Sequence, residues 1–292
     1  MMGTVAVNGE VARLESLRLQ DFLQGFFFGA GFFETFLLTE GAPMFLERHL
    51  ARLRASLSAH ADCVRAPPED TLTADAVRDA LRRCLEVDEA LGPRFTGVGK
   101  LVAGDGRLLL SFRALSEDHA RLQREGRELA EVEPRGYRRG DPTLQHKSTS
   151  YLRQYAHLAR LSVFCNEAGE LCEAPNGNLF FLMDGTVVTP PLDAPCLPGV
   201  SRAVLLEAGR LGEWPVVERA LGREQLEAVR GCVLTNSVGL ALAVPRLLGH
   251  ALPESAALAE HARTAVWAQA RREAHGGGRT TTPGGNRSGG SP

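Results

Sequence analysis

The hydrophobic pattern of this chain combines a helical period with a strand-and-turn period, and this combination limits the folds that the chain can adopt. Within Met44–Ala59 leucines recur every three or four residues, which predicts an amphipathic helix with one buried face. From Leu161 onward, short apolar runs alternate with turn dipeptides such as Ala168-Gly169 and Asp184-Gly185. That pattern predicts strands joined by hairpins. Together the two patterns predict an α+β fold.

The first part of the chain, residues 1–117, predicts a small α+β domain. Its helices are expected at Met44–Ala59 and at Thr73–Leu85, where Thr73 can act as the N-cap. Its strands are expected at Val5–Val7, Gly31–Leu38, Val98–Ala103 and Arg107–Ala114.

A larger domain is predicted for residues 118–275. A polar segment, Ser116–Asp141, spans its start, and we interpret this segment partly as a connector. After the strands and turns that start at Leu161, a buried strand is expected at Val229–Thr235. Helices are expected at Tyr151–Arg160, Ser201–Leu211 and Glu254–Glu273. The tail, residues 276–292, is rich in Gly, Ser, Thr and Pro, which predicts disorder.

Composition narrows the classes of function. The 292 residues have a net charge of -2 and no dense basic block, which argues against a nucleic-acid-binding surface. The most apolar patch, Phe26–Phe33, is far too short to span a bilayer, and the N-terminus does not resemble a signal peptide. The six cysteines are scattered and lack zinc-like spacing, so we expect reduced thiols, a cytoplasmic protein and no metal site.

Four short segments contain residues that are suited to chemistry. Lys147 lies in QHKSTSY, and Glu173 precedes APNGNLF. The segment Leu197–Arg202 (LPGVSR) opens a predicted helix, whose free N–H groups favour an anion. Thr235–Gly239 follows the buried strand and offers further hydroxyl and backbone donors. Taken singly, each segment has an ordinary alternative: a surface lysine, a strand-end carboxylate, a helix N-cap and a turn.

In order and spacing these segments resemble the class IV (fold-type IV) pyridoxal-phosphate enzymes. The resemblance rests on E-x-x-x-x-N-L-F from Glu173, the following D-G turn, T-P and L-P-G-x-[ST]-R. In the first half, GAGFFET (residues 29–35) is similar to the family's G-D-G-x-F-E-T, and HLARL (residues 49–53) to its H-x-x-R-L. The resemblance covers Val7 to about Val244. It implies two domains with pyridoxal 5'-phosphate (PLP) at their interface, a small-molecule substrate and a homodimer.

The resemblance also implies a role for each site residue. Lys147 would bind the cofactor as a Schiff base and then move protons at the reacting carbon, and Glu173 would keep the pyridine nitrogen protonated. Tyr151 would approach the phenolic oxygen of the cofactor, unless it is only a core aromatic. The remaining cofactor-binding residues would be Arg52, Val200, Ser201, Asn236 and Ser237 at the phosphate and Leu197 against the ring. A solvated helix-face arginine is the alternative for Arg52.

Three features favour aminodeoxychorismate lyase, which forms p-aminobenzoate and pyruvate for folate biosynthesis. TNSVGLALAV (residues 235–244) and HKSTSY (residues 146–151) are similar to segments of those lyases. The carboxylate-binding R-x-H and R-P elements of the D-amino-acid and branched-chain aminotransferases are missing, and Gly97-Val98-Gly99-Lys100 stands instead. Thr35 and Thr149 are candidates for protonating the leaving group. A class IV aminotransferase remains the first alternative.

Two departures from the family pattern leave a third function open, namely ligand binding without turnover. Ala30 replaces the Asp of G-D-G, and the stretch from Lys147 to Glu173 is short enough to remove about two turns of helix. A cluster of phenylalanines within residues 22–36 is expected in a core or a dimer interface, with a pocket wall as the alternative.

Overall fold

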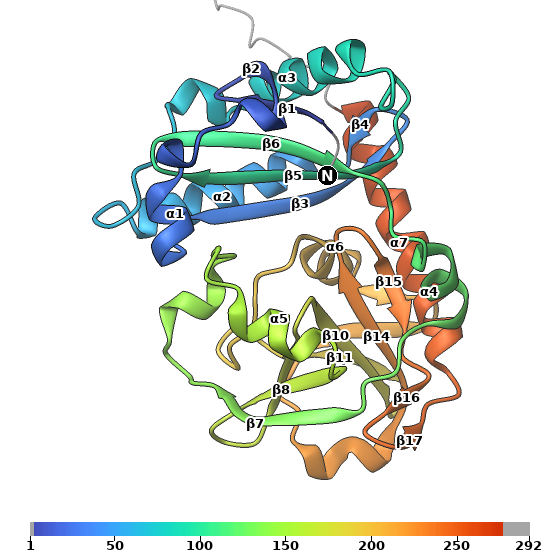
Figure 1. The fold of residues 1–292 in the computed structure, drawn as a ribbon. Coiled ribbons are helices and arrows are strands. Elements are labelled where there is room, and N and C mark those ends of the chain that lie inside the picture. Colours follow the sequence, from blue (N-terminus) through green and yellow to red (C-terminus); the bar gives the residue numbers. More distant parts are fainter. Residues whose placement is uncertain (1–2, 277–292) are drawn as a thin grey trace, which may run out of the picture.

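Two β-sheets, one from each half of the chain, organise the molecule (Figure 1). The computed structural model describes residues 3–276, apart from the side chains of residues 134–136 and 275–276. From residue 277 on, the predicted disordered tail lies outside the described residues.

The first sheet is antiparallel, with the strand order β2-β1-β6-β5-β3-β4. Its strands are β1 (Thr4–Val7), β2 (Glu10–Arg13), β3 (Phe32–Thr39), β4 (Ala42–Pro43), β5 (Gly97–Gly104) and β6 (Arg107–Arg113). Three helices belong to this half: α1 (Leu23–Phe28), α2 (Leu46–Ala59) and α3 (Ala74–Val87). Short 3-10 helices lie at Leu14–Ser16, Leu19–Asp21 and Glu69–Leu72.

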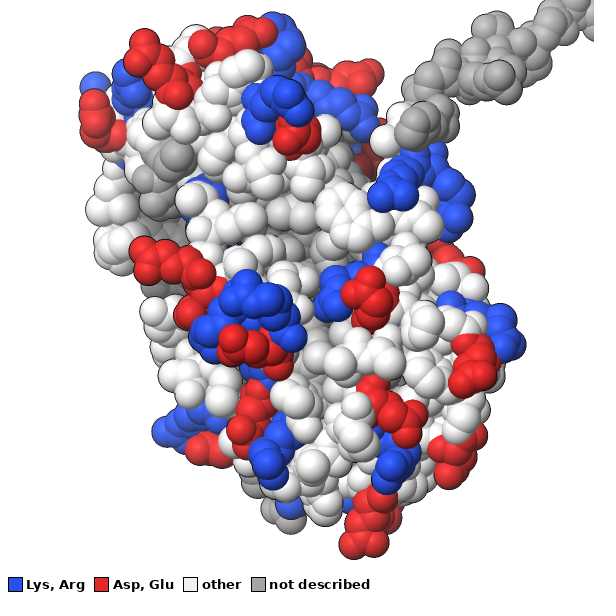
Figure 2. Space-filling model, turned by 90° about the vertical axis from the view of Figure 1, so that its right-hand side faces the viewer, with Lys and Arg blue, Asp and Glu red and all other residues white. Residues whose placement is uncertain are grey.

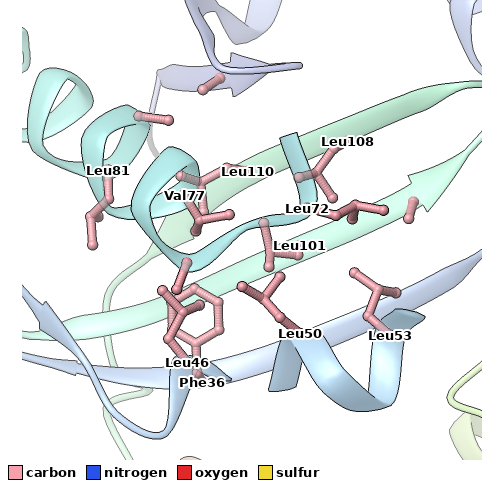
Figure 3. Close-up of a cluster of buried hydrophobic side chains, with 14 of the residues drawn as sticks. Phe36, Leu46, Leu50, Leu53, Leu72, Val77, Leu81, Leu101, Leu108 and Leu110 are labelled. Carbon is pink, nitrogen blue, oxygen red and sulfur yellow. The ribbon is translucent and has the colours of Figure 1, made fainter. Parts of the chain in front are cut away.

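Alternation along the strands gives the first sheet two different faces. Phe36 of β3 and Leu101 of β5 point to the face that α2 and α3 cover, and they pack with Leu50 and Val77 in a closed apolar cluster (Figure 3). Phe33, on the same strand as Phe36, points to the opposite face because side chains alternate with a period of two. That second face is turned toward the other half of the molecule (Figure 1).

The second sheet is mixed, with the order β12-β13-β11-β10-β9-β8-β7, and β14 joins β10 to β15. Its strands are β7 (Glu131–Tyr137), β8 (Ser162–Asn166), β9 (Leu171–Ala174), β10 (Gly177–Met183), β11 (Thr186–Thr189), β12 (Arg210–Leu211), β13 (Trp214–Glu218), β14 (Val229–Asn236) and β15 (Leu240–Ala243). The helices are α4 (His119–Glu125), α5 (Leu152–Leu158), α6 (Val200–Ala208) and α7 (Ser255–Gly276). A separate pair is formed by β16 (Arg246–Leu247) and β17 (His250–Ala251), and 3-10 helices lie at Pro142–Gln145 and Arg223–Ala228.

The two halves are joined by a shared apolar cluster and by ion pairs. Leu37 and Phe45 of the first half pack with Val204 of α6 and Leu258 of α7. Near these contacts Arg48 of α2 pairs with Glu207 of α6 at 2.6 Å and with Glu273 of α7 at 2.8 Å. α7 therefore extends from the second half up alongside the first (Figure 1).

Most predicted elements are present, and the α+β fold is confirmed. Thr73 caps α3, because its hydroxyl accepts a hydrogen bond from the N–H of Ala76 at 3.2 Å. The predicted helix Ser201–Leu211 is too long: it ends at Ala208, where Gly209 adopts a left-handed conformation (φ 67°). The boundary between residues 117 and 118 stays a prediction.

The connector is more structured than expected. Part of Ser116–Asp141 forms α4, and another part forms β7, which pairs in parallel with β8 through Glu131 and Ser162. β15 was also not predicted as a separate strand, although it lies within TNSVGLALAV. Both strands depend on partners outside their own segment, so local periodicity gives little sign of them.

Candidate active site

A cavity of about 880 Å³ lies between the second face of the first sheet and the second half of the chain. All nine predicted site residues line it: Arg52, Lys147, Tyr151, Glu173, Leu197, Val200, Ser201, Asn236 and Ser237. They come from α2, from the segment before α5, from β9, from the start of α6 and from the end of β14. The fold therefore brings together residues that are up to 185 positions apart in the sequence.

Lys147 is held against the first sheet by its backbone. Its carbonyl accepts a hydrogen bond from the N–H of Phe33 at 2.8 Å, and the ammonium nitrogen lies 4.6 Å from the centre of the Phe33 ring. Burial, helped by the charge of Arg52, lowers the pKa of Lys147 from 10.5 to about 8. A substantial fraction of this amine is therefore neutral near physiological pH, as a nucleophile or base requires.

Glu173 is a buried carboxylate that three donors orient. The hydroxyl of Tyr137 donates to Oε1 at 2.8 Å, while the N–H of Leu197 and the amide of Asn178 donate to Oε2 at 3.0 and 3.3 Å. Burial raises the pKa of Glu173 to about 7, although these hydrogen bonds oppose the shift. Among the described residues no cation forms an ion pair with Glu173, and its buried oxygens therefore suit a cationic ligand group.

Tyr151 lies at the end of the same segment as Lys147. The Tyr151 ring packs edge to face against Phe33, with the two ring centroids 5.3 Å apart. The ammonium nitrogen of Lys147 lies 5.4 Å from the centroid of the Tyr151 ring. Its hydroxyl donates to the carbonyl of Pro175 at 2.7 Å. The ring is thus part of the cavity wall beside Lys147.

The start of α6 forms the anion-binding end of the cavity. Ser201 is buried, and within the described residues its Oγ has no hydrogen-bond partner. Gly199 precedes the helix without a capping side chain, and a Cβ there would lie 2.0 Å from Oδ1 of Asn178. Free N–H groups at a helix N-terminus and an unused hydroxyl together provide donors for a phosphate.

Arg52 reaches this end from the first half of the chain. Its Nη1 donates to the carbonyl of Pro198 at 2.8 Å, directly before the start of α6. The interpretation of Arg52 as a solvated arginine is wrong, because only 10% of its side chain is exposed.

The loop after β14 also lines the cavity, and this loop, Arg52 and the start of α6 are together called the phosphate cup below. Oδ1 of Asn236 accepts hydrogen bonds from the N–H groups of Val238 at 3.1 Å and Gly239 at 2.7 Å, which folds the loop tightly. Ser237 lies within this turn and lines the cavity. The turn and the start of α6 therefore line the same cavity.

Sequence reasoning missed three groups that shape the site. Tyr137 belongs to the connector and gave no signal, whereas Asn178 is the Asn of the N-L-F motif and could have been singled out. Glu34, the Glu of F-E-T, lies within the resemblance, but no role was assigned to it. All three act through contacts with other site residues.

Within residues 3–276, no cluster of three or more His, Cys, Asp or Glu side chains is placed to hold a metal ion. Among the described helices, none combines the length and apolar character needed to cross a membrane.

Comparison with known proteins identifies the family. Residues 31–247 match the family described as amino-transferase class IV. The aminodeoxychorismate lyase of Bacillus subtilis is 28% identical over 259 residues, which is 80% of this chain and 83% of that protein. The chain belongs to the class IV aminotransferase family, and it is a PLP-dependent enzyme of the aminotransferase or lyase type.

Solved structures agree with this assignment. The PLP-bound form of a hypothetical aminotransferase from Mycobacterium tuberculosis superposes with a TM-score of 0.76 at 25% identity, covering 91% of this chain and 99% of that one. A putative 4-amino-4-deoxychorismate lyase from Legionella pneumophila gives a TM-score of 0.64 at 22% identity, covering 76% and 85% of the two chains. The second likeness shows the shared fold alone.

Proposed function

We propose that this chain is a 4-amino-4-deoxychorismate lyase that forms p-aminobenzoate and pyruvate. The observation that favours this reaction is the charge of the cavity wall away from the cofactor residues. Arg113, His119 and Arg127 line it, and within the described residues no carboxylate forms an ion pair with either arginine. The proposed substrate is a ring with two carboxylates, which such a wall would attract.

The segment that contains His119 and Arg127 is hydrogen-bonded to the strand and loop beside the phosphate cup. Gln123 of α4 donates to the carbonyl of Gly239 at 2.8 Å, and the N–H of Arg127 donates to the carbonyl of Ala243 at 2.8 Å. His119 is the first residue of α4, and Arg127 follows shortly after its last residue, Glu125. The position of Arg127 relative to the cup is therefore determined by these hydrogen bonds.

The residues of the cavity fit PLP. Ser201, the N–H groups at the start of α6 and Arg52 would hold the phosphate, Lys147 would bind the cofactor covalently, and Leu197 and Tyr151 would contact the ring. Glu173 would hold the proton of the ring nitrogen, for which its raised pKa and orienting donors prepare it. When bound, PLP supplies an electron sink for the carbanion that forms at the substrate carbon.

The chain's own groups would then move protons. Lys147 takes the proton from C4 of the substrate, since its lowered pKa leaves much of the amine unprotonated. Loss of that proton and departure of the pyruvate group leave an aromatic ring. The leaving group needs a proton in turn, and of the two candidates Thr35 lines the cavity. The hydroxyl of Thr149 instead donates to the carbonyl of Gly29 at 2.7 Å.

One incubation separates the lyase from the first alternative, an aminotransferase. The holoenzyme is incubated with aminodeoxychorismate in the absence of any keto acid. A lyase continues to release p-aminobenzoate and pyruvate, because it returns to its starting state without an amino acceptor. If this substrate is inert, while leucine, glutamate or D-alanine bleaches the protein until 2-oxoglutarate restores the colour, the chain is an aminotransferase. If neither set of substrates reacts, the third function, ligand binding without turnover, is favoured.

We further propose a homodimer in the cytoplasm. Phe26, Phe27 and Phe28 of α1 are 67%, 64% and 76% exposed, which is a large aromatic surface for a monomer. The rest of the predicted patch is not available, because Phe32 and Phe33 are buried. The cytoplasmic location is supported by six free cysteines, five of which are buried.

A further inference from the structure

A buried cluster of charged groups lies behind the phosphate end of the cavity and has no role in the proton transfers above. Glu34 of β3 is 1% exposed and accepts hydrogen bonds from Arg52 at both oxygens, from Nε at 2.8 Å and from Nη2 at 2.6 Å. Nδ1 of His49 lies 2.6 Å from Oε2 of the same carboxylate, and this ring is equally buried. Glu34 is thus a buried carboxylate with a forked contact to Arg52 and a third partner.

The protonation states in this cluster follow from its surroundings. Burial opposes ionisation of Glu34, but the charge of Arg52 and the hydrogen bonds from Arg52 and His49 outweigh it and lower the pKa to about 2. Burial lowers the pKa of His49, so its ring is neutral and its Nδ1–H donates to Glu34. Glu34 therefore stays charged over the whole working pH range.

This arrangement leaves Arg52 with spare donors that point in a fixed direction. A guanidinium group has five N–H donors. Glu34 accepts two of them and Pro198 a third, so two remain, and the side chain lines the cavity beside the start of α6. A long arginine side chain loses much conformational entropy when it binds a ligand, unless it is already held in place.

We propose that Glu34, supported by His49, is a positioning residue that holds Arg52 in the orientation needed to bind the cofactor phosphate. Glu34 itself is too deeply buried behind Arg52 to touch the cofactor. Its hydrogen bonds act at the phosphate end, because Lys147 and Glu173 are oriented by other contacts. The charge of Glu34 also raises the pKa of Lys147, but that effect is common to cofactor forms with and without the phosphate. The inference rests on the proposed role of Arg52, and the test below examines that role separately.

Two forms of the cofactor isolate the phosphate. PLP and pyridoxal differ only in that group, so each variant of the full chain is titrated with both, and binding is followed by the absorbance of the lysine-bound cofactor. For Glu34→Gln we expect PLP to bind about tenfold more weakly, a loss of roughly 1.4 kcal/mol, with less than a twofold change for pyridoxal. Glu47→Gln is the matched control, since Glu47 is exposed on the same helix as Arg52 and should leave both affinities unchanged.

The outcomes are distinguishable. If Arg52→Gln weakens PLP selectively and Glu34→Gln does not, Arg52 binds the phosphate without help from Glu34, and the proposal is overturned. Equal weakening of both ligands in Glu34→Gln would show a general structural role and also overturn it. If Arg52→Gln does not discriminate between the ligands, the cup assignment itself fails, whichever reaction the enzyme catalyses. Should Glu34→Gln not fold, Glu34→Asp keeps the charge but draws it back from Arg52, and the same selective loss is expected.

Discussion

At the scale of residues, burial shifts the pKa values of two cavity groups in opposite directions, and each shift favours the neutral form of its group. Burial lowers the pKa of Lys147 to about 8 and raises that of Glu173 to about 7. Perturbed values in a cleft are typical of functional groups, although ion pairs that serve structure can produce them too. Here the two groups line one cavity together with a helix N-terminus, which favours a functional origin.

Covalent attachment of the cofactor can be tested on an unusually simple background. The chain has only two lysines, Lys100 and Lys147, and of these Lys147 lines the cavity. We expect borohydride reduction of the holoenzyme, followed by peptide mapping, to find the pyridoxyl group on Lys147. A label on Lys100 would contradict the site assignment. Lys100→Arg is the control and should retain full labelling at Lys147.

Replacing Glu173 tests its role at the ring nitrogen. Glu173→Gln should still bind PLP, since the phosphate and lysine contacts remain, but a neutral amide cannot hold the ring proton. Loss of one hydrogen bond to a charged group is worth about 1.5–3 kcal/mol, so turnover should fall roughly ten- to hundredfold. Steady-state kinetics with saturating cofactor measure the effect. Unchanged turnover would mean that Glu173 is only a structural carboxylate.

The same carboxylate makes the stability of the cofactor-free protein depend on pH. Its pKa is higher in the folded state, about 7, than the ordinary value of 4.5 expected after unfolding. The stability is therefore fully present below pH 4.5 and is lost as the pH rises to about 7, by roughly 3 kcal/mol. Thermal unfolding at pH 4.5 and pH 7.5 should show that Glu173→Gln loses part of this dependence. The exposed Glu47→Gln serves as the control and should behave like the wild type.

At the scale of elements, the site depends on where β10 and α6 meet. Asn178 of β10 donates to the carbonyl of Leu197 at 2.8 Å and also to Glu173, so one amide links the carboxylate to the loop before α6. Residue 199 can lie this close to Asn178 only because it is a glycine and has no Cβ. A small change in this loop should therefore disturb both the ring end and the phosphate end of the cavity.

Gly199→Ala tests this close approach. The new Cβ would lie 2.0 Å from Oδ1 of Asn178, so Asn178 or the start of α6 must move. Overpacking of this kind costs about 1–3 kcal/mol, and we expect PLP affinity to fall about tenfold or more in an absorbance titration. Gly3→Ala is the control, because the nearest atom there is 3.7 Å away. Wild-type affinity in Gly199→Ala would show that the loop adapts freely.

At the scale of the whole molecule, the cavity lies between two halves that a shared core and ion pairs hold together. Charges of both signs are interspersed over one face of the molecule, without a broad patch of one sign (Figure 2). This surface fits an enzyme that binds a small molecule in a cleft. The distinctive exposed feature is instead the aromatic surface of α1, formed by Phe26, Phe27 and Phe28.

The proposed homodimer gives a prediction at this scale. Sedimentation of the active enzyme should give twice the mass of the chain, and Phe27→Arg should shift the equilibrium toward the monomer, because a charge is costly to bury in an apolar interface. Val87→Arg is the control, since Val87 is 59% exposed at the end of α3. A fully active wild-type species at monomer mass would contradict the dimer, and the surface of α1 would need another explanation.

The sequence by itself determined the features that depend on local order. The period of the leucines placed α2, the Thr73 hydroxyl placed the start of α3, and turn dipeptides placed the hairpins of the second sheet. The motif from Glu173 to Asn178 was readable because it lies within one hairpin, β9–β10, where five positions of sequence separate groups in contact. Patterns of this length express the preferences of single elements, which need no distant partner.

Only the tertiary structure decided which distant groups meet. Tyr137 reaches Glu173 from 36 positions away, and Arg52 reaches Pro198 from 146 positions away. Such pairs depend on how two sheets pack and on which face each strand turns inward, and a single sequence contains no periodic trace of that choice. The same packing produces the shifted pKa values, because burial rather than residue type is their main cause.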